Sequence, residues 1–240
     1  MKAEGLLRES KLDEAVDSLS EHLKDNPGDS QGRTFLFELL CFRGEYDRAA
    51  KHLALLGNRT KDAAVGALLY ESALHAEKLR AGLFETGDLP TPLAEDASRL
   101  RGSLNGKPFS SLLDADPRIG ARLEVFAAGD YLWVPLSQVA SIEMGPPTRL
   151  RDLVWASAVL RMSDKFRQRE LGEVLLPVLN PLSFQHPDAQ VRLGRVTEWC
   201  RDEQGREAPY GQKMLVADGV EIPFLEIRKV EIAQIEAAAR

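Results

Sequence analysis

The sequence predicts an α+β protein in which helical hairpins come first and a mainly antiparallel β domain follows. Ten of the 13 prolines and all three tryptophans lie after residue 105. Proline is excluded from helix interiors, whereas aromatic residues are enriched in strands. A repeated helical pattern near the N-terminus and short alternating apolar runs near the C-terminus agree with this division.

Residues 1–84 contain one helical pattern twice, at a spacing of 34 residues. Leu12, Ala15 and Leu19 of the first copy correspond to Tyr46, Ala49 and Leu53 of the second copy. Within each copy these positions lie at i, i+3 and i+7, which places them on one stripe of a helix. The period is that of tetratricopeptide repeats, so we predict a tetratricopeptide-like helical domain over residues 1–84.

A third helical pattern covers residues 62–84 and is expected to close the two repeats. Two hairpins leave an apolar face uncovered, because about three such units are usually needed for independent stability. The apolar residues of this predicted capping helix are Val65, Leu68, Leu69, Leu74 and Leu79.

Residues 85–108 are predicted to link the two parts. Pro90 and Pro92 interrupt the helix, a short helix is expected over residues 93–104, and Asn105-Gly106 marks another break.

Residues 109–240 are predicted to form the strand-rich domain, arranged as a small antiparallel sheet or a partly open barrel. Turn residues at 127–130 and at Asp218-Gly219 separate apolar runs that indicate two hairpins. The expected strands are 123–126, 131–134, 139–143, 159–162, 173–176, 190–196, 213–216, 220–222 and 225–232.

The first helix of each repeat is expected to line a concave groove that binds a peptide. This face has mixed polar and apolar character, as binding of an amphipathic helix or an extended peptide requires. The predicted groove residues are Glu4, Leu7, Arg8, Gln31, Thr34, Glu38 and Cys41. The competing interpretation is that these helices serve only as a scaffold.

Composition argues against several classes of function. The 240 residues carry a formal net charge of −6, which disfavours nucleic acid as the main partner. The sequence lacks an uncharged stretch long enough to cross a bilayer, and its two cysteines do not form a disulfide pattern. We therefore expect a cytoplasmic protein without membrane insertion.

Local motifs for catalysis or for cofactors are also missing from the sequence. The run 102–108 resembles a phosphate-binding loop but has three residues between its glycines and ends in Pro108. The four histidines are far apart in the sequence, without metal-ligand spacing. We expect no cofactor, no metal, no catalytic residues and no enzymatic activity.

Several motifs of the second half follow one another in a recognisable order. They are LDADPRIG at 113–120, LRDLVW at 150–155, LGRVTEW at 193–199 and PFLEIR at 223–228. Together with the helical repeats, they make the chain similar to the ImpE/SciE (TagJ) family of accessory proteins of bacterial type VI secretion systems. The chain departs from that family around residues 82–105, where it is shorter, and at 176–188, where a tyrosine-containing loop is missing.

The resemblance implies a non-enzymatic adaptor whose partner is the small subunit of the contractile sheath. The resemblance further implies that the adaptor contacts the N-terminal helix of this subunit and modulates sheath assembly or disassembly. The alternative from another class is a hydrolase or ligand-binding enzyme with a site around Asp114, Asp116, Arg151 and Glu198. A deep pocket that brings these groups together would favour the enzyme, whereas separate ion pairs would favour the adaptor.

Overall fold

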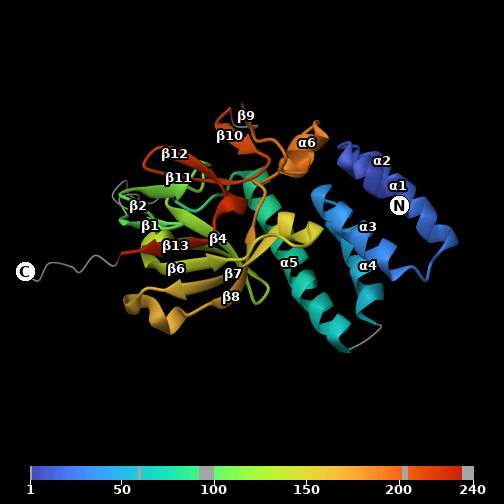
Figure 1. The fold of residues 1–240 in the computed structure, drawn as a ribbon, viewed down its shortest axis with the longest axis horizontal. Coiled ribbons are helices and arrows are strands. Elements are labelled where there is room, and N and C mark those ends of the chain that lie inside the picture. Colours follow the sequence, from blue (N-terminus) through green and yellow to red (C-terminus); the bar gives the residue numbers. More distant parts are fainter. Residues whose placement is uncertain (1, 59–60, 92–99, 202–204, 234–240) are drawn as a thin grey trace, which may run out of the picture.

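Five helices form the first part of the chain, and the strands follow (Figure 1). The computed structural model describes residues 2–58, 61–91, 100–201 and 205–233. The helices are α1 (Lys2–Arg8), α2 (Leu12–Asp25), α3 (Ser30–Phe42), α4 (Tyr46–Gly57) and α5 (Lys61–Thr86). The predicted α+β fold, with tetratricopeptide-like hairpins before a mainly antiparallel β domain, is confirmed.

The second helices of the two hairpins begin 34 residues apart, as the repeat predicts, because α2 begins at Leu12 and α4 begins at Tyr46. The stripe of α2 is buried along its whole length. At the start of α3 the Asp29 carboxylate accepts a hydrogen bond from the Gly32 amide at 2.9 Å. This cap satisfies a backbone donor that the helix itself cannot pair.

The turns that end α1 and α3 are equivalent positions of the two repeats. Ser10 and Gly44 both have left-handed backbone angles, with φ values of 60° and 68°. At Gly44 a side chain would collide with the ring of Phe184, because an added Cβ would lie 2.3 Å from it. Glycine is favoured in the second turn chiefly by this close contact, because Ser10 adopts a similar backbone angle in the first turn.

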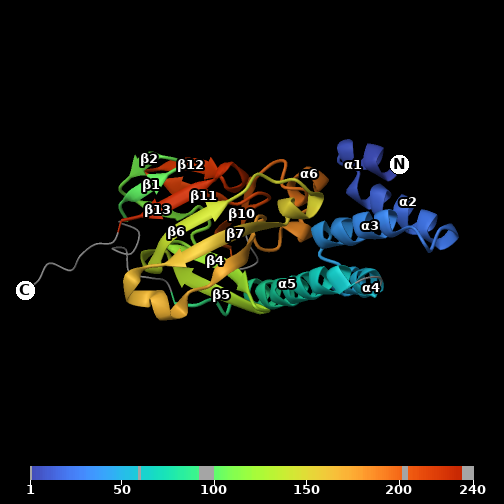
Figure 2. The ribbon, with the colours of Figure 1, turned by 60° about the horizontal axis from the view of Figure 1, so that its bottom comes forward.

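Helix α5 packs on α4 and then continues beside strand β5 of the sheet (Figure 2). Its buried side chains include Ala67, Ala73 and Leu74. The apolar residues expected to seal the repeats are mostly on the other side, because Val65, Leu68, Leu69 and Leu79 are exposed. Ala67, Ala73 and Leu74 pack in the core with the repeats, and Leu74 is the one of the five predicted capping residues that is buried there.

The main sheet has eight antiparallel strands in the order β2-β1-β13-β6-β7-β8-β4-β5. Hairpin turns at Asn105-Gly106, Ala128-Gly129 and Asp218-Gly219 have positive φ at both residues, as type I′ turns require. The strands are β1 (Gly102–Leu104), β2 (Lys107–Phe109), β4 (Arg122–Ala127), β5 (Asp130–Pro135), β6 (Val139–Met144), β7 (Trp155–Met162), β8 (Gly172–Pro177) and β13 (Lys229–Ile232).

Two smaller antiparallel sheets complete the β domain. One has the order β12-β11-β3, and the other pairs β10 with β9. Their strands are β3 (Leu112–Asp114), β9 (Glu198–Arg201), β10 (Glu207–Tyr210), β11 (Met214–Ala217) and β12 (Val220–Pro223).

Three sequence predictions differ from the structure. Residues 190–196, expected as a strand, contain helix α6 (Ala189–Arg192), whose N-cap Asp188 accepts from the Gln190 amide at 2.8 Å. The strand expected over 225–232 begins only at Lys229, after a 3₁₀ turn at Phe224–Glu226. Of the short helix expected over 93–104, residues 93–99 lie outside the described residues, and Gly102–Leu104 form β1.

Two apolar cores lie on the two faces of the main sheet. One joins the helices to the sheet, since it contains Phe37 of α3 together with Trp155 of β7 and Leu175 of β8. The other lies between the main sheet and the three-stranded sheet and contains Leu123 and Val125 of β4. Strand β4 is therefore buried on both faces, and the helices and the β domain share a core.

Candidate interaction surface

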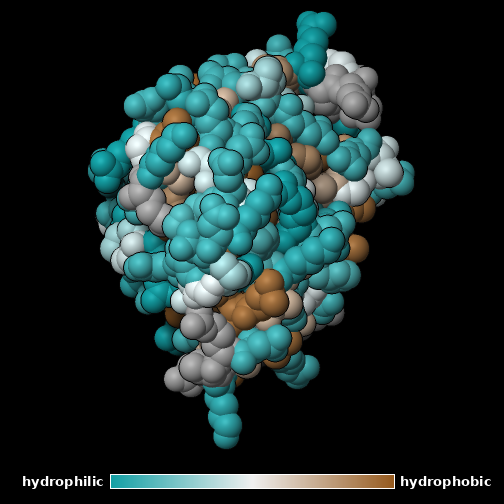
Figure 3. All heavy atoms as spheres, turned by 90° about the vertical axis from the view of Figure 1, so that its right-hand side faces the viewer, coloured by the Kyte–Doolittle hydropathy of each residue, from teal (hydrophilic) through white to brown (hydrophobic). Residues whose placement is uncertain are grey.

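The structure divides the predicted groove residues into an exposed group and a buried group. Glu38 and Cys41 are 8% and 3% exposed, and the Nη1 atom of Arg151 lies 3.7 Å from Glu38 Oε1. The β domain therefore fills the deep end of this face. Seen from the side of the helices, the surface is mostly hydrophilic, with hydrophobic side chains gathered near its lower end (Figure 3). Glu4, Arg8 and Gln31 are exposed, and Leu7 and Thr34 are partly exposed.

One segment of the β domain, residues 183–197, holds the helices and is named the clasp segment here. Arg192 donates to the Asp13 carboxylate at 2.6 Å, and Arg195 donates to the carbonyl oxygens of Leu7 and Arg8 at 2.8 and 3.0 Å. Arg195 also donates to the Ser10 hydroxyl at 2.8 Å. Arg195 thus reaches the C-terminal end of α1, where carbonyl groups lack helical partners, and Arg192 binds at the start of α2.

A second connection between helices and sheet is a buried ion pair. Arg80 of α5 donates to both oxygens of Glu124 of β4, at 2.7 and 2.9 Å. On the same helix, the Glu77 carboxylate accepts from the indole nitrogen of Trp155 at 3.0 Å. Two parallel bonds between a guanidinium and a carboxylate fix orientation as well as distance.

The same buried network continues across the sheet through Lys213. Its ammonium lies 2.6 Å from an oxygen of Glu124 and 2.6 Å from an oxygen of Asp114. Burial raises the pKa of Asp114 to about 6, although the cation of Lys213 opposes the rise. For Glu124 burial acts in the same direction, but Arg80 and Lys213 outweigh it and hold its pKa well below the usual range.

The four groups of the enzyme alternative do not meet in one site. Asp114 pairs with Lys213, Asp116 with Arg118, Arg151 with Glu38, and Glu198 with His186. Asp114 and Asp116 lie two residues apart but pair with different cations, and Arg151 and Glu198 contact partners in two other segments. This arrangement is the one expected of an adaptor.

The N-terminal half of α5 presents apolar side chains to solvent. Val65, Leu68 and Leu69, named the apolar row here, are 72%, 65% and 49% exposed and lie at i, i+3 and i+4. Leu69 also lines a cavity of about 410 Å³ on the sheet, together with Phe126, Val159 and other residues of β4, β6, β7 and β8. Exposed apolar side chains that adjoin a cavity make this part of α5 a candidate interaction surface.

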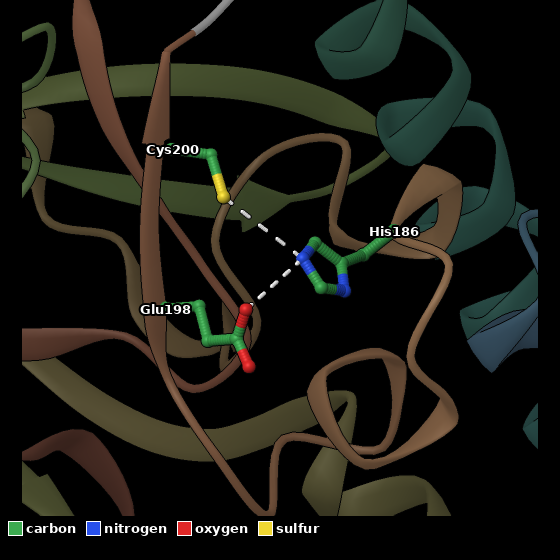
Figure 4. Close-up of side chains that lie close together, drawn as sticks. All are labelled: His186, Glu198 and Cys200. Carbon is green, nitrogen blue, oxygen red and sulfur yellow. Dashed lines mark hydrogen bonds and ion pairs between the residues drawn. The ribbon is translucent and has the colours of Figure 1, made fainter.

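A compact group of possible metal ligands lies where the clasp segment meets β9. The imidazole Nε2 of His186 faces the Glu198 carboxylate and the Cys200 sulfur (Figure 4). Sequence spacing alone does not reveal this group, because 12 and 14 residues separate His186 from Glu198 and Cys200. The available signal was the i, i+2 spacing of Glu198 and Cys200, which puts both side chains on one face of a strand.

Comparison with known families agrees with both parts of the fold. The sequence profile described as ImpE protein matches residues 106–231, which is more than half of the chain, and a tetratricopeptide repeat profile matches residues 6–70. The chain belongs to the ImpE family. The resemblance inferred from the sequence motifs is thereby confirmed.

Relatives of this ImpE-family chain extend over its full length. It is 31% identical to TagJ of Pseudomonas aeruginosa, a type VI secretion system accessory component, over 99% of this chain and 93% of the relative. A crystal structure of a protein from Vibrio parahaemolyticus has a TM-score of 0.83 at 20% identity and covers 97% of this chain and 98% of the other. The second comparison shows a shared fold.

The two matched regions correspond to the two sides of the interface between the helices and the β domain. The ImpE region contains the clasp segment and β4, whereas the tetratricopeptide region contains Asp13 and Ser10, to which the clasp segment binds. Among the described residues of this ImpE-family chain, none of the helices is both long enough and apolar enough to span a bilayer.

Proposed function

We propose that this ImpE-family chain is a non-enzymatic, cytoplasmic accessory component of a bacterial type VI secretion system. Its partner in this proposal is the small subunit of the contractile sheath, recognised through the N-terminal helix of that subunit. Binding would modulate sheath assembly or disassembly. The full-length similarity to TagJ of Pseudomonas aeruginosa supports the system, and the apolar row beside the sheet cavity supports recognition of a protein segment.

The observation that carries the proposed binding mode is the continuity of the apolar row with the cavity. An amphipathic helix presents apolar side chains at i, i+3, i+4 and i+7, so it can cover the row and insert a side chain into the cavity. Glu143 and Glu173 at the cavity wall are exposed carboxylates. They favour basic residues beside the apolar anchors of the partner helix, because opposite charges fix the register of docking.

The exposed part of the predicted groove remains a second proposed surface for the same function. The side chains of Glu4, Arg8 and Gln31 are exposed to solvent, and those of Leu7 and Thr34 are partly exposed. Glu38 and Cys41 are better explained as interface residues between the helices and the β domain.

Co-purification with the small sheath subunit tests the proposal. The full subunit is expected to be recovered with this chain, and a version that lacks its first helix is not. The double variant Val65→Glu/Leu68→Glu should abolish recovery, while Leu55→Glu, at another exposed apolar site on α4, should leave it unchanged.

The opposite outcomes are equally informative. Equal recovery of the full and shortened subunits would refute recognition through the helix. Loss of recovery in Glu4→Lys/Arg8→Glu, with normal recovery in the α5 variant, would move the site to the groove.

A further inference from the structure

The side chains of His186, Glu198 and Cys200 converge on one point between the clasp segment and β9 (Figure 4). The Cys200 sulfur lies 4.0 Å from His186 Nε2, and a Glu198 oxygen lies 3.5 Å from the same nitrogen. All three candidate ligand atoms lie within 4.8 Å of one another. They come from two segments, and the fold alone brings them together.

We propose that these three residues form a binding site for Zn²⁺. Imidazole, thiolate and carboxylate are the protein ligands that zinc prefers. With the usual bond lengths and a tetrahedral angle, the sulfur–nitrogen distance is about 3.6 Å and the nitrogen–oxygen distance is about 3.4 Å. The separations of 4.0 and 3.5 Å are close to these values.

Access and coordination number follow from the exposure of the three residues. The side chain of His186 is 10% exposed and that of Glu198 is 46% exposed, so an ion can enter from the Glu198 side. Three protein ligands leave a fourth tetrahedral position for water or for a ligand from another molecule. The site is thus of the open type.

Zinc binding requires defined changes of protonation. The Nδ1 atom of His186 accepts from the Asp188 amide at 3.2 Å, so in this arrangement the neutral ring carries its proton on Nε2. When zinc binds Nε2, that proton moves to Nδ1 and the hydrogen bond from Asp188 is given up. Cys200 binds as the thiolate, which releases one proton for each zinc ion.

The position of the site connects it to the interface between helices and sheet. Zinc would tie β9 to the clasp segment, whose Phe184 packs edge-on against Tyr46 with ring centroids 5.9 Å apart. The same segment holds α1 and α2 through Arg195 and Arg192. A ligand that binds only the folded state stabilises it, so zinc is expected to strengthen this junction.

Titration of the untagged full-length chain with Co²⁺ tests the proposal, because cobalt replaces zinc and reports its ligands by absorption. We expect one equivalent of Co²⁺ to give a thiolate-to-cobalt charge-transfer band, which Zn²⁺ then removes. Cys200→Ser should abolish the band, and His186→Ala should weaken binding by about 100-fold or more, beyond the loss typical of outer-sphere changes. Glu198→Gln should retain the thiolate band with weaker binding.

The matched control is Cys41→Ala, which removes the other, buried cysteine and should leave the band unchanged. Zn²⁺ should also raise the melting temperature of the parent chain but not that of Cys200→Ser, with circular dichroism showing that both are folded. Absence of the band in the folded parent chain, or its persistence in Cys200→Ser, would overturn the proposal.

Discussion

The two halves of helix α5 reverse the usual distribution of side chains. Its C-terminal half buries the charged side chains of Glu77 and Arg80, whereas its N-terminal half exposes Val65, Leu68 and Leu69. Buried charges are retained where they are paired, and apolar side chains are left in water where a partner covers them. The C-terminal half of α5 thus forms the junction with the sheet, and the N-terminal half is the surface proposed to bind a partner.

The largest expected loss of stability comes from breaking the buried ion pair in the C-terminal half of α5. Arg80→Ala removes the bidentate partner of Glu124 and leaves a buried carboxylate with Lys213 and the Tyr131 hydroxyl as partners. Loss of one partner of a buried ion pair costs about 3–5 kcal/mol, so the free energy of unfolding should fall by that amount in urea denaturation. Lys78→Ala, also on α5, breaks an exposed pair with Asp47 of α4 and should cost less than about 1 kcal/mol. Equal losses of unfolding free energy in the two variants would contradict this distinction between the buried and the exposed ion pair.

A smaller effect is expected at the contact between α5 and β7. Trp155→Phe keeps an aromatic ring in the shared core but removes the indole donor to Glu77. A buried acceptor that loses its partner costs about 1–3 kcal/mol, measured again by urea denaturation. Trp133→Phe serves as the comparison, because the Trp133 ring stacks on Phe84 of α5. An equally large loss of stability in this variant would show that ring size, not the hydrogen bond, determines the cost.

The buried network should also give a pH dependence. Because the pKa of Asp114 is raised to about 6 in the folded state, the folded chain binds a proton more tightly than the unfolded chain. This group therefore adds stability as the pH falls from 7.5 to 5, by about 1 kcal/mol.

Comparison with Asp114→Asn isolates this contribution. The variant should lack the gain, so the difference between the two chains in unfolding free energy should change by about 1 kcal/mol over the same pH range. A difference that is independent of pH would show that Asp114 remains ionised throughout.

The smallest effect on stability is expected at the exposed end. Leu68→Glu changes a side chain that is 65% exposed, so the free energy of unfolding should change by less than about 0.5 kcal/mol. Binding of the small sheath subunit should nevertheless be lost in the same variant, as seen by co-purification. A large loss of stability would mean that the apolar row packs within the chain.

The sequence was informative where local rules decide the structure. The 34-residue period located α2 and α4, and the Asp218-Gly219 turn located the hairpin of β11 and β12. The sequence predicts only a break at Asn105-Gly106, although the same residue pair is a strong hairpin signal and joins β1 to β2.

The remaining features depend on long-range contacts. Val191 and Leu193 fit a strand pattern, but the cap at Asp188 and the contacts of the clasp segment favour a helix there. The burial of Glu38 and Cys41 follows from the docking of the β domain, which the repeat pattern alone does not specify. The meeting of His186 with Cys200 is likewise set by the path of the chain between them.

The two left-handed turns of the repeats have an evolutionary consequence. Arg195 binds the first turn at Ser10, and Phe184 lies against the second at Gly44. The β domain therefore contacts the repeats at two points separated by one repeat. Insertion or deletion of a hairpin between them would displace both contacts at once. The number of repeats in this chain is therefore constrained by the β domain, whereas free-standing arrays of this type can lengthen and shorten.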